Sequence, residues 1–296
     1  MTSIWQHLRY PEKVTASDSV ITMKHILDGL LDSMKHTDYN NLSELTSPTT
    51  LPNDDYLPAV LHIGIVEVDI QHNNKVLPMI GYLSTSCGSN DSWFVAVDQQ
   101  RLEGELIVES ANKLGFSRSD DGTWKFNDAI IMSEKDAIQA FIDNLVEKSK
   151  LSSSKSVILI TPRYDVTLPI LISALSYHNL LGQFLKIVKG FGDMELLSSS
   201  KKIQFKNGGL KPYEEYLKST SITSLSNQSL DKPEERATVL WMILEQFLSG
   251  KPNYDNFYRL YCRPTVSPYT IKLLFNSHIL EVRDTYHRIT IINKVC

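Results

Sequence analysis

The order of strand-like and helix-like segments limits the fold of this chain more than any single motif does. Residues 59–70 (AVLHIGIVEVDI) are β-branched and apolar over a length that is typical of a central strand. Strand-like residues 75–84 and 93–97 follow after short connections. Three successive strands with short connections predict an antiparallel meander.

Helices and strands alternate after the meander. Ser133 and Asp136 form a capping box that opens a helix, and Pro233 with Glu234 and Glu235 marks the first turn of a late helix. The other predicted elements are a strand at 157–160, a helix at 168–177, a strand at 183–188 and a short helix at 193–197. This order predicts an α/β fold, a mixed sheet with helices on its faces. Few common folds share it, and the ribonuclease-H-like exonuclease fold is the leading one.

Three regions are expected along the chain. Residues 1–55 hold an amphipathic helix and a polar, proline-containing linker; the helix would pack on the domain or, less favoured, serve a partner. Residues 56–250 form the exonuclease-like domain, in which the Ser- and Thr-rich segment 208–228 is predicted to be a mobile loop beside the cleft. Residues 251–296 form a helical, aromatic tail that would be part of a truncated second domain.

Cysteine usage and hydropathy favour an intracellular protein. The three cysteines, Cys87, Cys262 and Cys296, are far apart and include no CxxC pair, which is typical of a reducing compartment. The first residues lack the pattern of a secretory signal, and no apolar run reaches the ~20 residues that a membrane span needs. We therefore expect a cytoplasmic protein without membrane partners. Its net charge of −4 favours no polyanionic partner as a whole but leaves room for a local basic face.

The first catalytic motif of the DEDD exonucleases, which have this fold, is degenerate here. That motif is Asp-x-Glu on the first strand, where two carboxylates on one side help to hold two metal ions. Asp69 fits the first position, but Gln71 replaces the glutamate, and a neutral amide is a poor ligand for a hard divalent ion. Glu67 lies on the same side, so a Glu67-x-Asp69 pair is a less favoured substitute. We expect Asp69 to be a polar residue at a strand end.

The second and third motifs are degenerate as well. Asp165 lies one residue before the position of the second aspartate, which turns a helical side chain by ~100°, so its expected role is to cap that helix. Glu234 stands where the last aspartate is usual, but Ser229 replaces the histidine base five residues earlier. We expect Glu234 to be a first-turn charge, and the protein to be no enzyme and to need no cofactor. Mg²⁺ or Mn²⁺ belongs only to the alternative, an active 3′–5′ exonuclease that uses Asp69, Glu67, Asp165 and Glu234.

Several segments resemble the exonuclease-like domain of the exuperantia family. The longest is residues 157–193, which has a strand, a proline in the following helix, a Leu-Leu-x-x-Phe bend and a Val-Lys-x-Phe strand end. Residues 64–70 and 236–241 also look similar, so the resemblance spans residues 59–250. It implies a DEDD-like domain that has lost catalytic carboxylates, forms homodimers and works with RNA in maternal mRNA localisation during insect oogenesis, together with a following helical domain. This chain would have room for only part of that helical domain.

Two basic regions are candidates for RNA contact. One surrounds residues 188–212 and the other lies among tyrosines in the tail; their residues are Lys186, Lys189, Lys201, Lys202, Lys206 and Lys211, and Arg259, Arg263, Lys272, Arg283 and Arg288. We expect a catalytically inactive module that binds RNA and self-associates as a homodimer in mRNA localisation, transport or storage. The alternatives are the active exonuclease and an interaction scaffold that binds no nucleic acid.

Overall fold

The computed structural model describes the greater part of the predicted domain. It covers residues 56–70, 75–98, 111–120, 123–127, 129, 131–154, 156–195, 210–248 and 262–264, with side chains except at 68–70, 75–77, 165 and 262–264. The expected N-terminal helix, its linker and the helices of the tail lie outside these residues.

The predicted meander forms the first half of a mixed sheet. Strands β1 (Tyr56–Ile70), β2 (Lys75–Ser86) and β3 (Trp93–Val97) pair antiparallel in sequence order. Both ends of β3 are as predicted. The pairing of β1 with β2 shifts register between Gly64 and Ile65, as at a β-bulge.

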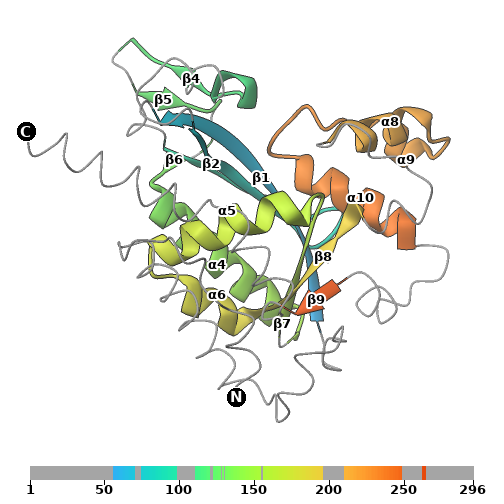
Figure 1. Ribbon diagram of the computed structural model, residues 1–296. Coiled ribbons are helices and arrows are strands. Elements are labelled where there is room, and N and C mark those ends of the chain that lie inside the picture. Colours follow the sequence, from blue (N-terminus) through green and yellow to red (C-terminus); the bar gives the residue numbers. More distant parts are fainter. Residues whose placement is uncertain are drawn as a thin grey trace, which may run out of the picture.

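Parallel strands extend the sheet on the other side of β1. Strands β7 (Ser156–Thr161) and β8 (Val188–Asp193) run parallel to β1. The two edge strands are short: β6 (Ile131–Met132) is parallel to β3, and β9 (Cys262–Pro264) is antiparallel to β8. In the described chain the strand order is β6-β3-β2-β1-β7-β8-β9, which confirms the predicted α/β class with a mixed sheet (Figure 1).

Three helices cover one face of the sheet: α4 (Glu134–Leu151), α5 (Tyr164–Tyr177) and α6 (Leu181–Ile187) (Figure 1). Alternate residues of β1, among them Leu57 and Leu61, are buried against these helices. Apolar faces of the three helices complete this core, which is the largest in the described part.

The opposite face is covered by α8 (Lys211–Ser219), α9 (Thr223–Ser226) and α10 (Arg236–Leu248). Val60 of β1 and Ile160 of β7 point to this side and pack against the three helices. Figure 1 shows α10 crossing beside the middle of β1, with α8 and α9 outside it.

A small hairpin adds a separate aromatic cluster on the α10 side of the sheet. Its strands are β4 (Ser117–Arg118) and β5 (Trp124–Lys125). Phe116 and Phe126 of the hairpin region pack edge to face, 4.7 Å between ring centroids, and Phe126 also contacts Tyr82 of β2. The helices α8, α9 and α10 and the aromatic cluster of the hairpin therefore cover this side of the sheet, and Tyr82 lies where they meet.

Ser133 caps α4 as predicted. The backbone N–H of Asp136 donates to Ser133 Oγ over 3.2 Å, and Oγ donates in turn to the Asp136 carboxylate. Lys148 and Lys150 lie in the last turn, where positive charge suits the negative end of the helix dipole.

Helix α5 begins at Tyr164, earlier than the predicted residue 168. In the structure Pro169 lies inside α5, so the helix lacks one backbone hydrogen bond. Asp165 therefore lies in the first turn of α5, and the N-cap is Arg163 instead of the predicted Asp165.

The prediction was wrong for residues 183–187. These residues, predicted as a strand, lie in α6, and the strand of this region is β8, which begins at Val188 and includes the Val-Lys-x-Phe segment 188–191. Leu181, Phe184 and Leu185 are buried at helical spacing in α6. The apolar run is so short that its period does not separate a helix from a strand.

The segment 208–228, predicted to be a mobile loop, contains α8 and α9. Two buried residues of α8, Tyr213 and Leu217, anchor it to the core. The Tyr213 hydroxyl also donates to the carbonyl of Pro162 over 3.2 Å. Its Ser- and Thr-rich composition suggested a loop, but the apolar residues at i and i+4 decide the structure.

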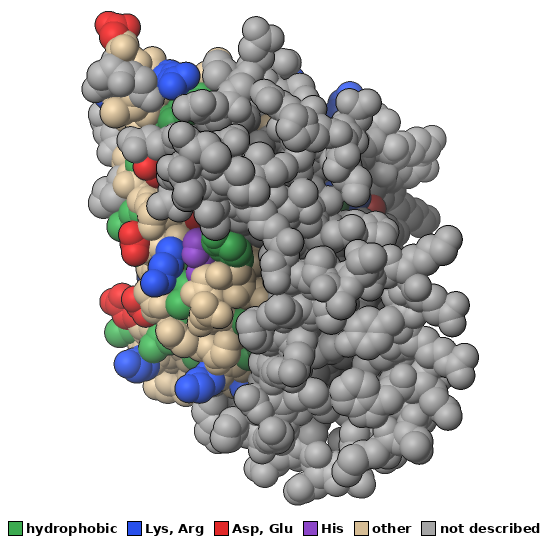
Figure 2. All heavy atoms as spheres, turned by 60° about the vertical axis from the view of Figure 1, so that its left-hand side comes forward, with side chains coloured by type: hydrophobic (Ala, Val, Ile, Leu, Met, Phe, Trp, Pro, Cys, Tyr) green, Lys and Arg blue, Asp and Glu red, His purple; other side chains and the backbone are tan. Residues whose placement is uncertain are grey.

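The described surface is mixed in character. On the side that Figure 2 brings forward, its hydrophobic side chains lie scattered among charged and polar ones. Among described residues the large apolar side chains with high exposure are Leu151, 73% exposed, and Tyr177, 36%. Single exposed apolar residues of this kind are ordinary on protein surfaces.

Candidate functional site

The carboxyl end of β7 and the start of α10 meet the middle of β1. The pairing of β1 with β7 ends at Val60 and Ile160, so the next residues of β1 lie just beyond the end of β7. On the α10 side these residues are His62 and Gly64, because side chains alternate between faces along a strand. Gly64 pairs with Tyr82 of β2. Functional side chains commonly gather at the carboxyl ends of strands in α/β sheets, which makes this the candidate site.

Three side chains from β1, β2 and α10 are joined here, and we call them the His62–Tyr82–Arg236 cluster. The Arg236 guanidinium donates from Nη1 to the Tyr82 hydroxyl oxygen, and its carbon lies 5.8 Å from the centre of the Tyr82 ring. His62 Nδ1 lies 3.1 Å from the same hydroxyl. Because Arg236 already donates to that oxygen, the hydroxyl hydrogen is available for His62 Nδ1. Arg236 Nε donates to the Leu230 carbonyl over 2.6 Å.

Arg236 is the charged member of this cluster at neutral pH. Burial, reinforced by the positive charge of Arg236, lowers the pKa of His62 from 6.5 to about 3. Burial raises the pKa of Tyr82 to about 12, although Arg236 acts in the opposite direction. The cluster therefore consists of a neutral imidazole, a neutral phenol and one guanidinium cation.

Gly64 permits the close approach of the Tyr82 ring. A Cβ atom at position 64 would lie 2.1 Å from Tyr82 Cε1, well inside any permitted contact. The Tyr82 ring therefore fills the space above Gly64 on the α10 side of β1. Glycine in the middle of a strand often marks such a close approach.

Glu234 is the carboxylate next to this cluster. It lies two residues before α10, in the turn, and not in the first helical turn as expected. Its backbone carbonyl accepts from Ser92 Oγ over 3.0 Å. Its Oε2 atom is buried and has no hydrogen-bond partner among the described residues. Its negative charge contributes to the raised pKa of Tyr82, as a smaller effect than burial.

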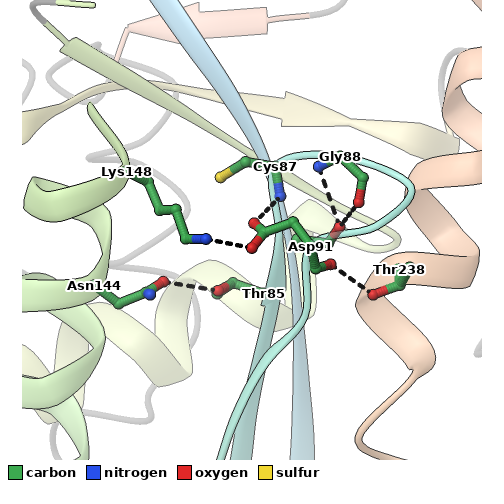
Figure 3. Close-up of polar contacts among 8 residues, drawn as sticks. Thr85, Cys87, Gly88, Asp91, Asn144, Lys148 and Thr238 are labelled. Carbon is green, nitrogen blue, oxygen red and sulfur yellow. Dashed lines mark hydrogen bonds and ion pairs between the residues drawn. The ribbon is translucent and has the colours of Figure 1, made fainter. Parts of the chain in front are cut away.

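The turn between β2 and β3 fastens the start of α10 to the sheet (Figure 3). The Thr238 hydroxyl of α10 donates to the Asp91 backbone carbonyl over 2.8 Å. The Asp91 carboxylate accepts from the backbone N–H of Cys87 over 2.9 Å and forms a close ion pair with Lys148 of α4. One turn therefore holds helices on both faces of the sheet, and we call this arrangement the Asp91 clasp.

Cys87 lies in the same turn and is poorly suited to act as a nucleophile. Burial, together with the negative charge of Asp91, raises the pKa of its thiol from 9.0 to about 12. The thiolate is the nucleophilic form of cysteine. At neutral pH this thiol is protonated, so the structure favours a structural role for Cys87.

The structure does not bring the predicted carboxylates together at this place. The backbone of Asp69 pairs with Val76 near the far end of the β1–β2 hairpin. At ~3.3 Å per residue that is about 30 Å along the strand from Val60. Glu67 is exposed and, by alternation along β1, lies on the face opposite α10 and Glu234. Gln71 lies outside the described residues.

The basic residues predicted to contact RNA are only partly described. Lys186 is exposed on α6, Lys189 of β8 donates to the Leu185 carbonyl over 2.9 Å, and Lys211 is exposed on α8. Because α6 and α8 cover opposite faces of the sheet, Lys186 and Lys211 do not share one surface. Arg263 has only its backbone described, in β9. The remaining candidates are outside the described part: Lys201, Lys202, Lys206, Arg259, Lys272, Arg283 and Arg288.

The chain matches no model of a protein family, and no curated protein matches it.

No described helix has the length and apolar character that crossing a membrane requires. Among described side chains, no group of three or more His, Cys, Asp or Glu is placed to hold a metal ion.

Proposed function

We propose that this chain is a catalytically inactive ribonuclease-H-like module that binds RNA without cutting it. The strand order β3-β2-β1-β7-β8, in which β2 alone is antiparallel to the others, supports this fold. The order of strands and helices along the chain and the resemblance of residues 157–193 to exuperantia-type domains support it too. Self-association and a role in mRNA localisation rest on that resemblance alone, whereas a cytoplasmic location rests on cysteine usage and hydropathy.

The observation that carries the proposal is the position of Arg236. A two-metal nuclease of the DEDD type has two carboxylates two residues apart on the first strand. In this chain the β1 residues just beyond the end of β7, on the α10 side, are His62 and Gly64. The imidazole is held neutral, and the Tyr82 ring covers the glycine.

The charge of Arg236 opposes a divalent metal at the same place. At ~4 Å it would repel each unit charge of a metal ion by about 4 kcal/mol, at the effective dielectric constant of a protein surface. Glu234 is a carboxylate beside the cluster, and among the described side chains no group of three or more His, Cys, Asp or Glu is placed there to hold two metal ions. The described side chains here do not fit Mg²⁺ or Mn²⁺, so we assign no metal-dependent step to them.

The proposal is tested with end-labelled single-stranded RNA, incubated with the full chain in Mn²⁺ or in EDTA. Denaturing gels report cleavage and native gels report binding in the same samples. We expect intact RNA in both conditions and a shifted band that weakens as salt rises, because phosphate contacts release counterions. Shortening from the 3′ end only with Mn²⁺ would make the chain an active exonuclease. Intact, unshifted RNA would leave an interaction scaffold.

A further inference from the structure

Two lysine-containing segments come together at one pole of the described structure. Residues 148–156 and 181–192 contain several lysines and no Asp or Glu, although Glu147 directly precedes the first segment and Asp193 directly follows the second. These lysines are Lys148, Lys150, Lys155, Lys186 and Lys189, of which Lys155 lies outside the described residues. The first segment is the end of α4 and the loop to β7, and the second is α6 with the start of β8.

The fold brings these two segments to the same end of the sheet. Strands β7 and β8 are parallel neighbours, and Val157 pairs with Val188, so both strands start at the same level. Helix α4 ends shortly before β7 and α6 ends directly before β8. Figure 1 shows both helices ending beside the starts of these strands. At the lower end of the described part in Figure 2, basic side chains gather and the acidic side chains lie higher.

Two of these lysines are available for a ligand. Lys150 and Lys186 are exposed, and neither forms an ion pair with a described residue. Lys148 is engaged by Asp91 in the Asp91 clasp, and Lys189 donates to the Leu185 carbonyl. Lysines in the last turn of a helix also stabilise it by complementing the helix dipole. The dipole of each helix acts separately, so it does not explain why the lysines of two helices lie at the same end of the sheet.

We propose that this basic pole, with Lys150 and Lys186 at its centre, is the surface that contacts the RNA phosphate backbone. The inference rests on the proposed RNA-binding function and deepens it. It places the RNA at the amino ends of β7 and β8. The His62–Tyr82–Arg236 cluster lies at the other end of β7, which has six residues and is therefore about 20 Å long. Binding would then be independent of the site where a nuclease of this fold cuts.

The test compares salt dependence of RNA binding for two matched double variants of the full chain. Lys150→Gln with Lys186→Gln removes two charges from the pole. Lys125→Gln with Lys218→Gln removes two exposed charges from β5 and α8 on the α10 side of the sheet, with the same change in net charge. Affinity for a 20-nucleotide poly(U) RNA is measured between 50 and 200 mM salt, roughly the range over which phosphate contacts change affinity most visibly.

We expect the pole variant to flatten the plot of log affinity against log salt by about 0.7 for each lysine removed, and the Lys125→Gln, Lys218→Gln control to match wild type. Equal slopes in the pole variant and wild type, with RNA bound by both, would overturn the inference and leave the proposed function standing. No binding by wild type would overturn both. Lysine-dependent binding to anionic lipid vesicles in place of RNA would overturn both as well. Circular dichroism of each variant shows that the fold is kept.

Discussion

Arg236, the first residue of α10, donates a hydrogen bond to Tyr82 of β2, 154 positions earlier in the chain. This contact joins the helical cover of the sheet to the aromatic cluster around the β4–β5 hairpin. It also places a permanent positive charge over the middle of β1. Since guanidinium groups stay protonated in proteins, that charge does not depend on pH.

Arg236→Met is expected to lower the free energy of unfolding by about 2 kcal/mol. The substitution leaves the Leu230 carbonyl and the Tyr82 hydroxyl without their charged donor, while the methionine keeps much of the apolar stem. Urea unfolding followed by tryptophan fluorescence measures the change. The matched control is Lys232→Met, which removes an exposed cation and its surface ion pair with Glu235 from the preceding turn and is expected to change stability little. Equal effects of the two substitutions would contradict the role of Arg236.

Gly64→Ala is expected to destabilise the fold by about 3 kcal/mol, because the new methyl group meets the Tyr82 ring. The cost should fall markedly in a Tyr82→Leu background, where the ring is absent. A double-mutant cycle in urea measures this coupling. Independent, additive effects of the two substitutions would contradict the close contact between Gly64 and Tyr82.

His62 is expected to make the protein less stable as pH falls. Its pKa is lowered from 6.5 to about 3 in the folded state, so between these values the unfolded chain binds more protons at this residue. Stability therefore rises with pH across this window, by at most about 1.4 kcal/mol per pH unit, and is complete above pH 6.5. His62→Gln should flatten that part of the stability curve. An imidazole NMR signal of His62 that titrates near pH 6.5 in the folded protein would contradict this account.

Cys87 is expected to react with iodoacetamide more slowly in the folded protein than in urea, by about one to two orders of magnitude, because its pKa rises from 9.0 to about 12 and the higher nucleophilicity of that thiolate offsets part of the loss. Peptide mapping by mass spectrometry separates Cys87 from Cys262 and Cys296. Asp91→Asn removes a charge that raises this pKa and breaks the ion pair with Lys148, so it should increase the rate at Cys87. An unchanged rate in Asp91→Asn would show that Asp91 does not control the thiol.

Sequence patterns that lie within a single helix or strand gave reliable predictions of structure. The β3 bounds and the Ser133 cap were predicted correctly because alternation and capping are set by neighbouring residues. Short apolar segments were predicted less well. The apolar pattern of residues 183–188 is compatible with the period of a helix and with that of a strand. The segment forms a helix because Phe184 and Leu185 pack into the core with α4 and α5.

The candidate site could not be predicted, because it depends on strand register. Spacing alone selected Asp69 and Gln71 as the remnant of a metal motif on β1. Register with β7 instead places His62 and Gly64 at the end of the parallel strands. Nothing in local sequence links residue 82 to residue 236, so Tyr82 and Arg236 were missed. The signal that could have been used is Gly64, a glycine inside an otherwise β-branched strand.

The central claim, that Arg236 and its neighbours leave no place for catalytic metal ions, is tested most directly by counting free Mn²⁺ by electron paramagnetic resonance. Mn²⁺ is titrated into wild type, into Glu234→Gln and into Arg236→Gln. Wild type and Glu234→Gln are expected to leave the same concentration of free Mn²⁺, because no bound ion depends on Glu234. One or two Mn²⁺ ions bound per wild-type chain and lost in Glu234→Gln would contradict the account and restore the active exonuclease.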